Sequence, residues 1–365
     1  MKVWWGWMIV LLAGCTSEES GPQVSQGSEV RPLVAQHFTT FTVPAGHRLL
    51  VFGDSAHHDT IGDLLVPTGG LQRIATLSTT HLPYMSTLGC ADRVVAAAHL
   101  EQVRDVATRE RHALGQVMEI GTADGVDREA LITVAPDVLL GYPFGRSGSD
   151  TAVAGVPLLM IAEYLEPHPL GRAEWLKFFG VLVGKTDLAD SLYAGIADRY
   201  ERAKATVGNS PRPKVLFGSQ WNGQWWVPPG NSYMAQLIKD AGGDYIFSDR
   251  RGKENNAVDM ETMLVRAHDV DRWGMIADLP HFPNAHDFTG GDARLAQLRV
   301  VRMNELFLGN TASKDLFGQA LVEPDVVLME LTEIMHPFPG ILDPTWHPGY
   351  FERLRDMIPP PPEDQ

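Results

Sequence analysis

Two glutamates, Glu129 and Glu261, occupy equivalent positions in an internal repeat of the sequence. Residues 126–138 (VDREALITVAPDV) and residues 258–270 (VDMETMLVRAHDV) match without a gap at six positions. Each copy predicts a short helix capped by an aspartate and followed by a buried strand. A carboxylate in the first turn stabilises a helix N-terminus, and an exposed one can also pair with an arginine of a partner protein. Two copies this far apart predict two similar lobes.

A basic cluster is a second candidate for recognition chemistry. Arg250, Arg251 and Lys253 stand together in a chain whose net charge is −15. Guanidinium groups bind carboxylate or hydroxamate oxygens well, so Arg250 and Arg251 would suit an anionic ligand if their loop borders a cleft. The alternative interpretation is a solvated turn.

Three further candidates follow a predicted strand. Residues 71–78 predict a strand and residues 79–89 a helix, and the next strand completes a parallel α/β unit. Open α/β folds bind ligands at the carboxyl ends of their strands, which makes Thr80, His81 and Tyr84 candidates for a pocket. The alternatives are that the threonines cap the helix and that Tyr84 packs in the core.

Tryptophans gather after another predicted strand. Trp221, Trp225 and Trp226 surround Asn222-Gly223, a sequence typical of a hairpin or loop. Exposed aromatic side chains beside the carboxyl end of a sheet suit the rim of a site for an apolar or aromatic ligand. We expect Trp221 to face the cleft and at least one of the others to fill the core.

Histidines raise the alternative of a zinc or manganese site. His81, His99, His168 and His281 could meet in a cleft, but such a site needs several histidines and a carboxylate to converge. Only His81 falls at a predicted cleft turn, so we predict no metal site. No Gly-x-Ser-x-Gly, P-loop, Gly-x-Gly-x-x-Gly or His-Glu-x-x-His motif occurs in the sequence. This favours a binding protein without a cofactor over an enzyme.

Composition narrows the class of partner. The chain has 365 residues, of which 44% are apolar and 21% charged, a profile typical of soluble globular proteins. Its acidity makes nucleic acid a poor partner. Two cysteines cannot form a disulfide framework, and we expect Cys90 to be a small buried side chain.

The N-terminus predicts a membrane anchor. In residues 1–14, Lys2 precedes an apolar run that is too short to span a bilayer. The run ends in Leu-Ala-Gly-Cys15, which resembles the bacterial lipobox, whose cysteine is diacylated and becomes the new N-terminus. Acyl chains on Cys15 would hold the mature protein on a membrane surface outside the cytoplasm. Residues 15–36 predict a flexible tether.

The rest of the chain predicts two lobes and a connecting helix. Apolar residues recur at helical spacing and breakers are few from residue 173 to residue 207. We therefore expect an interlobe helix over residues 169–208. It would join an N-terminal lobe of residues 37–168 to a C-terminal lobe of residues 209–340. A proline-rich tail of residues 341–365 would follow.

Several motifs, taken in order, resemble one family. They are similar to the periplasmic substrate-binding lipoproteins of iron-siderophore and vitamin B12 ABC importers, over roughly residues 70–340. The stretches that carry the resemblance are residues 73–81 (RIATLSTTH), 88–95 (LGCADRVV), 129–140 (EALITVAPDVLL), 163–175, 227–245 and 322–337.

The resemblance implies an α/β protein with two doubly wound lobes linked by one long backbone helix, and a ligand in the cleft between them. It implies a monomer that carries a ferric siderophore to the permease dimer of an ABC importer. Cobalamin or haem are alternatives, as is zinc or manganese in a related receptor. Glu129 and Glu261 fall where family members carry the acids that contact permease arginines. Residues 300–303, which include Arg302, resemble a closing strand at the cleft.

Overall fold

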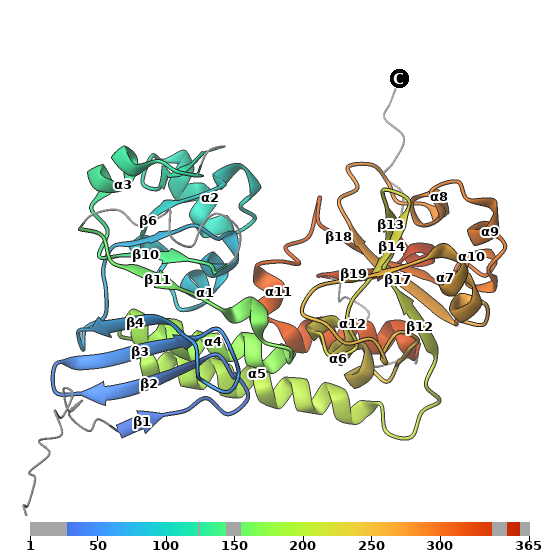
Figure 1. Ribbon diagram of the computed structural model, residues 1–365, viewed down its shortest axis with the longest axis horizontal. Helices are drawn as coiled ribbons and strands as arrows, with labels where there is room; N and C mark the ends of the chain where they lie inside the picture. The colour runs from blue at the N-terminus through green and yellow to red at the C-terminus, as the bar shows by residue number, and fades with distance from the viewer. Residues whose placement is uncertain (1–27, 123–124, 144–154, 338–348, 358–365) are drawn as a thin grey trace, which may run out of the picture.

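The structure consists of two α/β lobes that lie along a pair of helices (Figure 1). It is a computed structural model that describes residues 28–122, 125–143, 155–337 and 349–357. The predicted signal peptide, Cys15 and most of the predicted tether lie outside these ranges. Within them, no helix is long and apolar enough to cross a membrane.

The first lobe is built on a five-stranded parallel sheet with the order β11-β10-β5-β6-β7. The four residues of β10 are all buried, as expected for a parallel strand that is covered on both faces. The elements of the sheet and its connections are β5 (Ile74–Thr76), α1 (Leu82–Thr87), β6 (Val94–Ala97), α2 (Val106–Ala113), β7 (Met118–Glu119), α3 (Arg128–Val134), β10 (Val138–Gly141) and β11 (Leu158–Met160).

The first lobe also contains a four-stranded antiparallel sheet, which precedes the parallel sheet in the chain. Its strands are β1 (Ser28–Val30), β2 (Phe38–Val43), β3 (Gly46–Phe52) and β4 (Thr60–Val66), paired in that order. β2 and β3 form an antiparallel hairpin that turns between Val43 and Gly46. Because β1 belongs to the sheet, ordered structure begins inside the segment predicted as a tether.

Two buried carboxylates tie the segment between β1 and β2 to the body. Glu174 accepts the backbone N–H groups of residues 33–35 at 2.7–2.9 Å. Glu166 accepts those of residues 36 and 37 at 2.9–3.0 Å. Burial raises the pKa of Glu166 to about 7, although these N–H groups and Trp175 act in the opposite direction. Five consecutive backbone donors are thus satisfied by two side chains.

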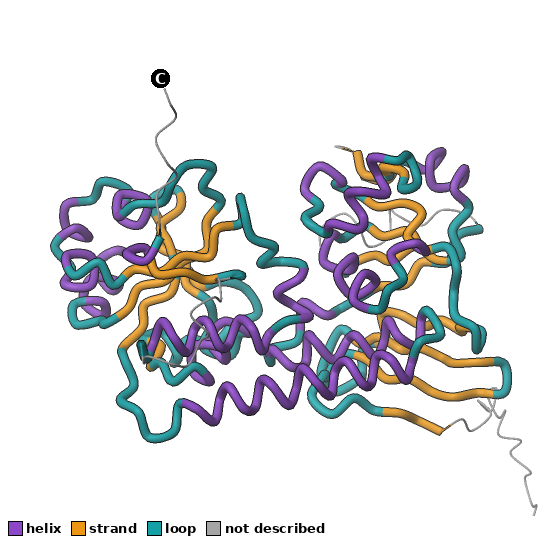
Figure 2. The backbone as a smooth tube through the Cα atoms, turned by 180° about the vertical axis from the view of Figure 1, so that it is seen from behind, coloured by secondary structure: helices purple, strands orange, loops and turns teal. Residues whose placement is uncertain are grey.

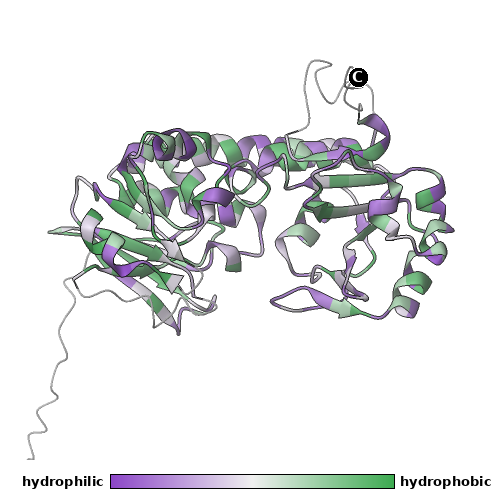
Figure 3. Ribbon diagram, turned by 90° about the horizontal axis from the view of Figure 1, so that it is seen from above, coloured by the Kyte–Doolittle hydropathy of each residue, from purple (hydrophilic) through white to green (hydrophobic). Residues whose placement is uncertain are grey.

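The second lobe repeats the architecture of the first. Its main sheet has the order β15-β12-β17-β18-β19, in which only the edge strand β19 is antiparallel. The order β15-β12-β17-β18 corresponds to β6-β5-β10-β11 of the first lobe, and apolar residues line the strands of both lobes (Figure 3). The strands are β12 (Lys214–Phe217), β15 (Asp244–Tyr245), β17 (Arg272–Ala277), β18 (Leu306–Asn310) and β19 (Phe351–Arg353). Since β19 lies after residue 340, the second lobe reaches into the segment predicted as a tail.

The second lobe also contains a smaller sheet and seven helices among the described residues. A second, three-stranded sheet consists of β13 (Ser219–Trp221), β14 (Gln224–Val227) and β16 (Asn256–Val258). The helices are α6 (Tyr233–Asp240), α7 (Met260–Ala267), α8 (Ala285–Thr289), α9 (Ala293–Ala296), α10 (Arg299–Arg302), α11 (Gln319–Val322) and α12 (Pro324–Met335).

The internal repeat corresponds to a helix and the strand after it. Asp127 caps α3 by accepting the N–H of Ala130 at 2.9 Å, and Asp259 caps α7 by accepting that of Thr262 at 2.8 Å. In both lobes the strand that follows, β10 or β17, pairs with the first strand of the parallel sheet. The predicted equivalence of the two helices is confirmed.

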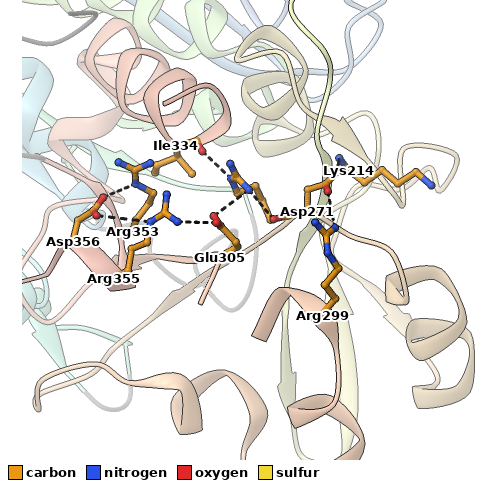
Figure 4. A network of polar contacts seen from close by, with 9 residues as sticks. Lys214, Asp271, Arg299, Glu305, Ile334, Arg353, Arg355 and Asp356 are labelled. Atoms are coloured by element: carbon orange, nitrogen blue, oxygen red, sulfur yellow. Dashed lines mark hydrogen bonds and ion pairs between the residues drawn. The ribbon is translucent and has the colours of Figure 1, made fainter. Parts of the chain in front are cut away.

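The gapless match is wrong at its end, however. The carboxylate of Asp137 accepts the N–H groups of Gln72 and Arg73 at 2.8 and 2.9 Å, at the start of β5. In the second lobe Asp271, not Asp269, accepts the N–H of Lys214 at 2.9 Å, at the start of β12 (Figure 4). The second copy therefore contains two more residues between its helix cap and its strand.

The single helix predicted over residues 169–208 is divided into two helices in the structure. The connection consists of α4 (Pro169–Leu182) and α5 (Thr186–Thr206), which pack antiparallel under the first lobe before α5 continues to the second (Figure 2). The chain reverses at Gly184, whose φ is +66° and whose Cβ would lie 2.7 Å from the backbone of Gly69. Thus α5 alone is the long helix that links the lobes.

Candidate ligand-binding site

A cavity of about 350 Å³ lies between the lobes. The first lobe contributes residues 36–37, 53–55 and 164–167, and the second contributes residues 231–233 and 252–253. The predicted cleft between two lobes is therefore present as a cavity that both lobes line.

A larger cavity of about 570 Å³ adjoins it in the second lobe. Phe217 and Gly218 at the end of β12, together with Ile276 near the end of β17, form part of its wall. This is the carboxyl edge of the parallel sheet, where open α/β folds bind ligands. The two cavities share four residues, which are Arg172, Ser232, Tyr233 and Lys253.

Arg172 is fixed at the junction of the two cavities. It lies in the first turn of α4, and its guanidinium donates to the carbonyl oxygens of Glu166 and Tyr164 at 3.2 and 2.9 Å. The guanidinium also lies over the ring of Tyr233, 4.4 Å from the ring centroid. Both contacts orient the cation before any ligand arrives, which lowers the entropic cost of binding an acceptor group.

Tyr233 and Lys253 face Arg172 from the second lobe. Tyr233 begins α6, whose N-cap is Ser232. Burial raises the pKa of Tyr233 to about 12, so its phenol is neutral and can donate a hydrogen bond. Lys253 lies in the loop before β16, and the described part of the chain gives its ammonium no ion-pair partner. Arg172, Tyr233 and Lys253 therefore offer donors to one region of the cleft.

Thr80 and His81 lie at the predicted turn but point into the first lobe. His81 is 1% exposed, and its Nδ1 lies 2.7 Å from Oγ1 of Thr76. Its Nε2 lies 3.8 Å from Oε2 of Glu163, and Oε1 of Glu163 accepts the Thr80 hydroxyl at 2.5 Å. Burial lowers the pKa of His81, so its imidazole is neutral at pH 7. Neither Thr80 nor His81 lines the two cavities.

Tyr84 is a core residue, as the alternative interpretation had it. Its side chain is fully buried and its ring stacks on Phe179 with 4.7 Å between centroids. Its hydroxyl donates to the backbone carbonyl of Arg172 at 2.8 Å. Tyr84 can therefore affect a ligand only by positioning Arg172, because its packing against α4 leaves no surface for direct contact.

The tryptophans of the hairpin take three different environments. Trp225 is buried, Trp221 is 65% exposed, and Trp226 lines the larger cavity. The predicted Asn222-Gly223 turn is confirmed, with φ of +51° and +77°. Alternation of side chains along β14 explains the outcome, since Trp225 and Trp226 point to opposite faces of the small sheet. Trp226, rather than the predicted Trp221, faces the cavity.

The predicted arginines lie at the edge of the site or outside it. Arg250 is half-buried and Arg251 is exposed, and neither lines the two cavities, whereas Lys253 of the same cluster lines both. Arg302 ends helix α10 on the outer side of the second lobe (Figure 1). The expected strand over residues 300–303 is wrong, because β18 occupies the place beside β17.

The histidines of the metal alternative are dispersed. No group of three or more histidine, cysteine or acidic side chains that could hold a metal ion occurs among the described residues. His168 caps α4 by accepting the N–H of Leu170, and His281 pairs with Asp287 at 2.8 Å. His99 is well exposed, with its Nδ1 3.9 Å from a carboxylate oxygen of Glu101.

Glu129 and Glu261 occupy the first turns of α3 and α7, and both are exposed. Neither carboxylate forms an ion pair with another described residue. They therefore form an equivalent pair of accessible acids, one on each lobe.

Arg172 and Tyr233 were not among the site residues predicted from the sequence. Each follows a clear helix start, Pro169 for α4 and Ser232 for α6, so the helices themselves could be located. That both first turns meet at one cleft depends on how α4 folds back on α5, which no local pattern indicates.

Two α/β lobes, a linking helix and an interlobe cavity define a two-lobed solute-binding protein. The family model for periplasmic binding proteins matches residues 74–274, which is more than half of the chain. The chain belongs to the periplasmic binding protein family.

Curated relatives include two lipoproteins of Methanocaldococcus jannaschii, both described as uncharacterised. One is 27% identical over 283 residues, which are 73% of this chain and 66% of that protein. The other is 21% identical and covers 90% of this chain and 93% of its own length. This chain thus spans slightly less than two thirds of the first relative.

Solved structures of lower identity share the fold. A periplasmic heme binding protein of Pseudomonas aeruginosa has a TM-score of 0.58 at 18% identity and covers 73% of this chain and 93% of its own. An Fe3+-hydroxamate transport protein of Saccharomonospora viridis has 0.53 at 18%, covering 72% and 93%. The vitamin B12 binding protein of Vibrio cholerae has 0.54 at 12%, covering 73% and 96%. At these identities the likeness concerns the fold alone.

Proposed function

We propose that this protein is a lipid-anchored, extracytoplasmic solute-binding protein that delivers a ferric siderophore to an ABC importer. The observation that carries the proposal is the pair of adjoining cavities with Arg172 fixed at their junction. Membership in the periplasmic binding protein family supports a binding role and gives no support to catalysis.

The composition of the cavity walls supports a metal chelate as the ligand. Phe217, Trp226 and Phe317 give the larger cavity an aromatic lining, and Arg172 and Lys253 supply cations. An iron chelate presents flat or apolar organic groups together with oxygen atoms. The aromatic side chains can pack against the organic groups, and the cations can bind the oxygen atoms. Haem and cobalamin fit the same description and are the alternative ligands.

We propose that Glu129 and Glu261 dock the protein on the two permease subunits of the importer. Their exposure on equivalent helices supports this role, because a two-lobed protein that meets a pseudo-symmetric dimer needs one contact per lobe. Arginine–carboxylate pairs would set the register of the complex as well as contribute energy.

We propose Cys15 as the lipid attachment site, which would hold a monomeric protein at a membrane surface. The lipobox-like sequence and the lipoprotein relatives support the anchor. Mass spectrometry of the membrane fraction tests it: diacylglycerol mass on Cys15 is expected, and a soluble, unmodified N-terminus would contradict it.

Tryptophan fluorescence of the unlipidated protein tests the ligand. We would titrate it with a ferric hydroxamate, a ferric catecholate, cyanocobalamin, haemin and zinc. Saturable submicromolar quenching by one chelate, reduced in Trp226→Phe but not in Trp221→Phe, is the expected result. A fluorescence response to zinc alone would favour the metal-receptor alternative. No fluorescence change with any of these ligands would overturn the proposal.

A further inference from the structure

We propose that the 350 Å³ cavity, one wall of which is the N-terminal antiparallel sheet, is a polar subsite of the ligand pocket, and that donors around this cavity bind an oxygen-rich, anionic group of the ligand. The inference rests on the proposed solute-binding function. The sheet, residues 28–66, precedes residues 74–274, which the family model matches. It is therefore a feature of this chain that the matched region does not include.

The sheet provides one wall of the 350 Å³ cavity. His37 at the start of β2 and the loop of residues 53–55 after β3 face Ser232 and Lys253 across the cavity. The pKa of His37 is lowered by burial and by the charges of His57 and Lys253, while the hydrogen bond to the Phe52 backbone and the charge of Asp54 act in the opposite direction. Lys253 of the second lobe is thus close enough to act electrostatically on the first.

The two acids on this wall already accept hydrogen bonds from the chain itself. The Asp54 carboxylate accepts the N–H groups of residues 56 and 58 at 2.8 and 3.2 Å. Glu166 accepts two backbone N–H groups and the Nε1–H of Trp175, which lies at 3.2 Å. Both bonds to Asp54 are accepted by Oδ1, so its Oδ2 can still accept a donor, whereas Glu166 has little remaining capacity.

Donors, in contrast, remain available. Lys253 has no ion-pair partner within the described ranges. Asn231 accepts the N–H of Gly252 through Oδ1 at 3.1 Å, which leaves its NH₂ group for another acceptor. Arg172 and Tyr233 add a guanidinium and a neutral phenol. A carboxylate, a catecholate or a phosphate satisfies such a set, because each is anionic and acceptor-only.

The wall is held rigidly without a ligand. The buried acids of the α4 region clamp residues 33–37, as described above. Phe38, the next residue, packs edge-on against Trp175 and Phe178 of α4 with centroid distances of 4.9 and 5.5 Å. A subsite fixed in this way discriminates between ligands by charge and shape, because it does not adapt to them.

Since the two cavities adjoin at Arg172, the ligand that fits them has two parts. Its aromatic or apolar body occupies the larger cavity beside Trp226, and its anionic group enters the smaller one beside Lys253.

Matched probes test the subsite. One pair is haemin and its dimethyl ester, and the other is a ferric trihydroxamate with and without a pendant carboxylate. We expect the wild type to bind the anionic member of at least one pair about tenfold more tightly. Lys253→Ala and Ser55→Glu should each remove most of this preference, the second by placing a negative charge on the wall. Lys239→Ala and His58→Glu, which alter exposed residues that do not line the cavity, should preserve it.

The outcomes separate the two proposals. If a chelate binds but Lys253→Ala and Ser55→Glu behave as their controls do, the subsite is refuted and the solute-binding function stands. If no probe binds to the wild type, the chelate-binding function fails and the subsite fails with it. Because all four positions are surface residues, circular dichroism should show unchanged folding in each variant.

Discussion

The guanidinium of Arg172 lies over the ring of Tyr233, 4.4 Å from its centroid, and this contact joins α4 to the first turn of α6. Each residue lines both cavities of the cleft. The hydroxyl of Tyr84 helps to fix Arg172 by donating a hydrogen bond to its backbone carbonyl. A ligand that touches this pair therefore contacts both the lobe connection and the second lobe.

Removal of the guanidinium should affect both binding and stability. We expect Arg172→Ala to weaken chelate binding at least tenfold and to lower the free energy of unfolding by about 1–3 kcal/mol, since a cation–π contact and two hydrogen bonds are lost. Arg172→Lys keeps the charge without the planar fork and should be intermediate. Fluorescence titration and urea unfolding measure the two effects. Wild-type affinity in Arg172→Ala would remove this residue from the site.

A glycine pair tests the reversal between α4 and α5. Gly184→Ala should destabilise the fold by about 1–3 kcal/mol, because the new Cβ meets the Gly69 backbone and φ is +66°. Gly195→Ala lies within α5, where the Cβ meets only the end of the Arg199 side chain, and should be neutral or stabilising by up to about 1 kcal/mol. Urea unfolding measures the free energy of unfolding of both variants. Equal changes in the two variants would contradict the assignment of the turn to Gly184.

The docking acids should separate transport from binding. We expect Glu129→Ala combined with Glu261→Ala to reduce chelate uptake about tenfold or more while ligand affinity stays unchanged. Glu110→Ala, an exposed acid on α2, is the matched control. Uptake of a radiolabelled iron chelate by cells and fluorescence titration of the purified variant provide the two readouts. Unimpaired uptake in the double variant would exclude docking through these residues.

The titration of Glu166 should appear in the pH dependence of stability. Its pKa is about 7 in the folded state against a reference of 4.5, so its contribution is fully present below about pH 4.5 and is lost as pH rises through 7. The loss between pH 5 and pH 8 is at most about 3 kcal/mol. Glu166→Gln should flatten the pH profile by up to that amount.

Urea unfolding at pH 5 and pH 8 measures this effect, with Glu110→Gln as the exposed control. Glu330, whose pKa burial also raises to about 7, remains in both variants, so a residual slope of the same sign is expected. Parallel profiles for wild type and Glu166→Gln would show that the Glu166 carboxylate does not titrate in this range.

Local signals predicted much of the fold. The caps at Asp127 and Asp259 and the Asn222-Gly223 hairpin turn depend on contacts only a few residues apart, and all three were confirmed. The resemblance of residues 300–303 to a closing strand misled, because these residues form a turn of helix and β18 already fills the sheet position beside β17.

The site was less predictable because it depends on distant contacts. Sequence placed Tyr84 and Trp221 near carboxyl strand ends correctly, but not the direction of their side chains. The orientation of Tyr84 is set by Phe179, almost a hundred residues away in the chain. The resemblance of the motifs to a family predicted the cleft. Arg172 and Tyr233 are recognised as site residues only when the helix hairpin brings both lobes together.

Asp137 and Asp271 occupy equivalent positions in the two lobes, so one molecule contains two versions of the same contact. Through Oδ2, Asp137 accepts two backbone N–H groups and Asp271 accepts one, at 2.8–2.9 Å and at the start of the first strand of each parallel sheet. In the second copy, two more residues separate the helix cap from the strand. The aspartate still bonds to the strand backbone, so the contact depends on the position of the aspartate in the sheet and not on its distance from the cap along the chain. The same substitution at both positions would measure two related interactions, in different surroundings, within one protein.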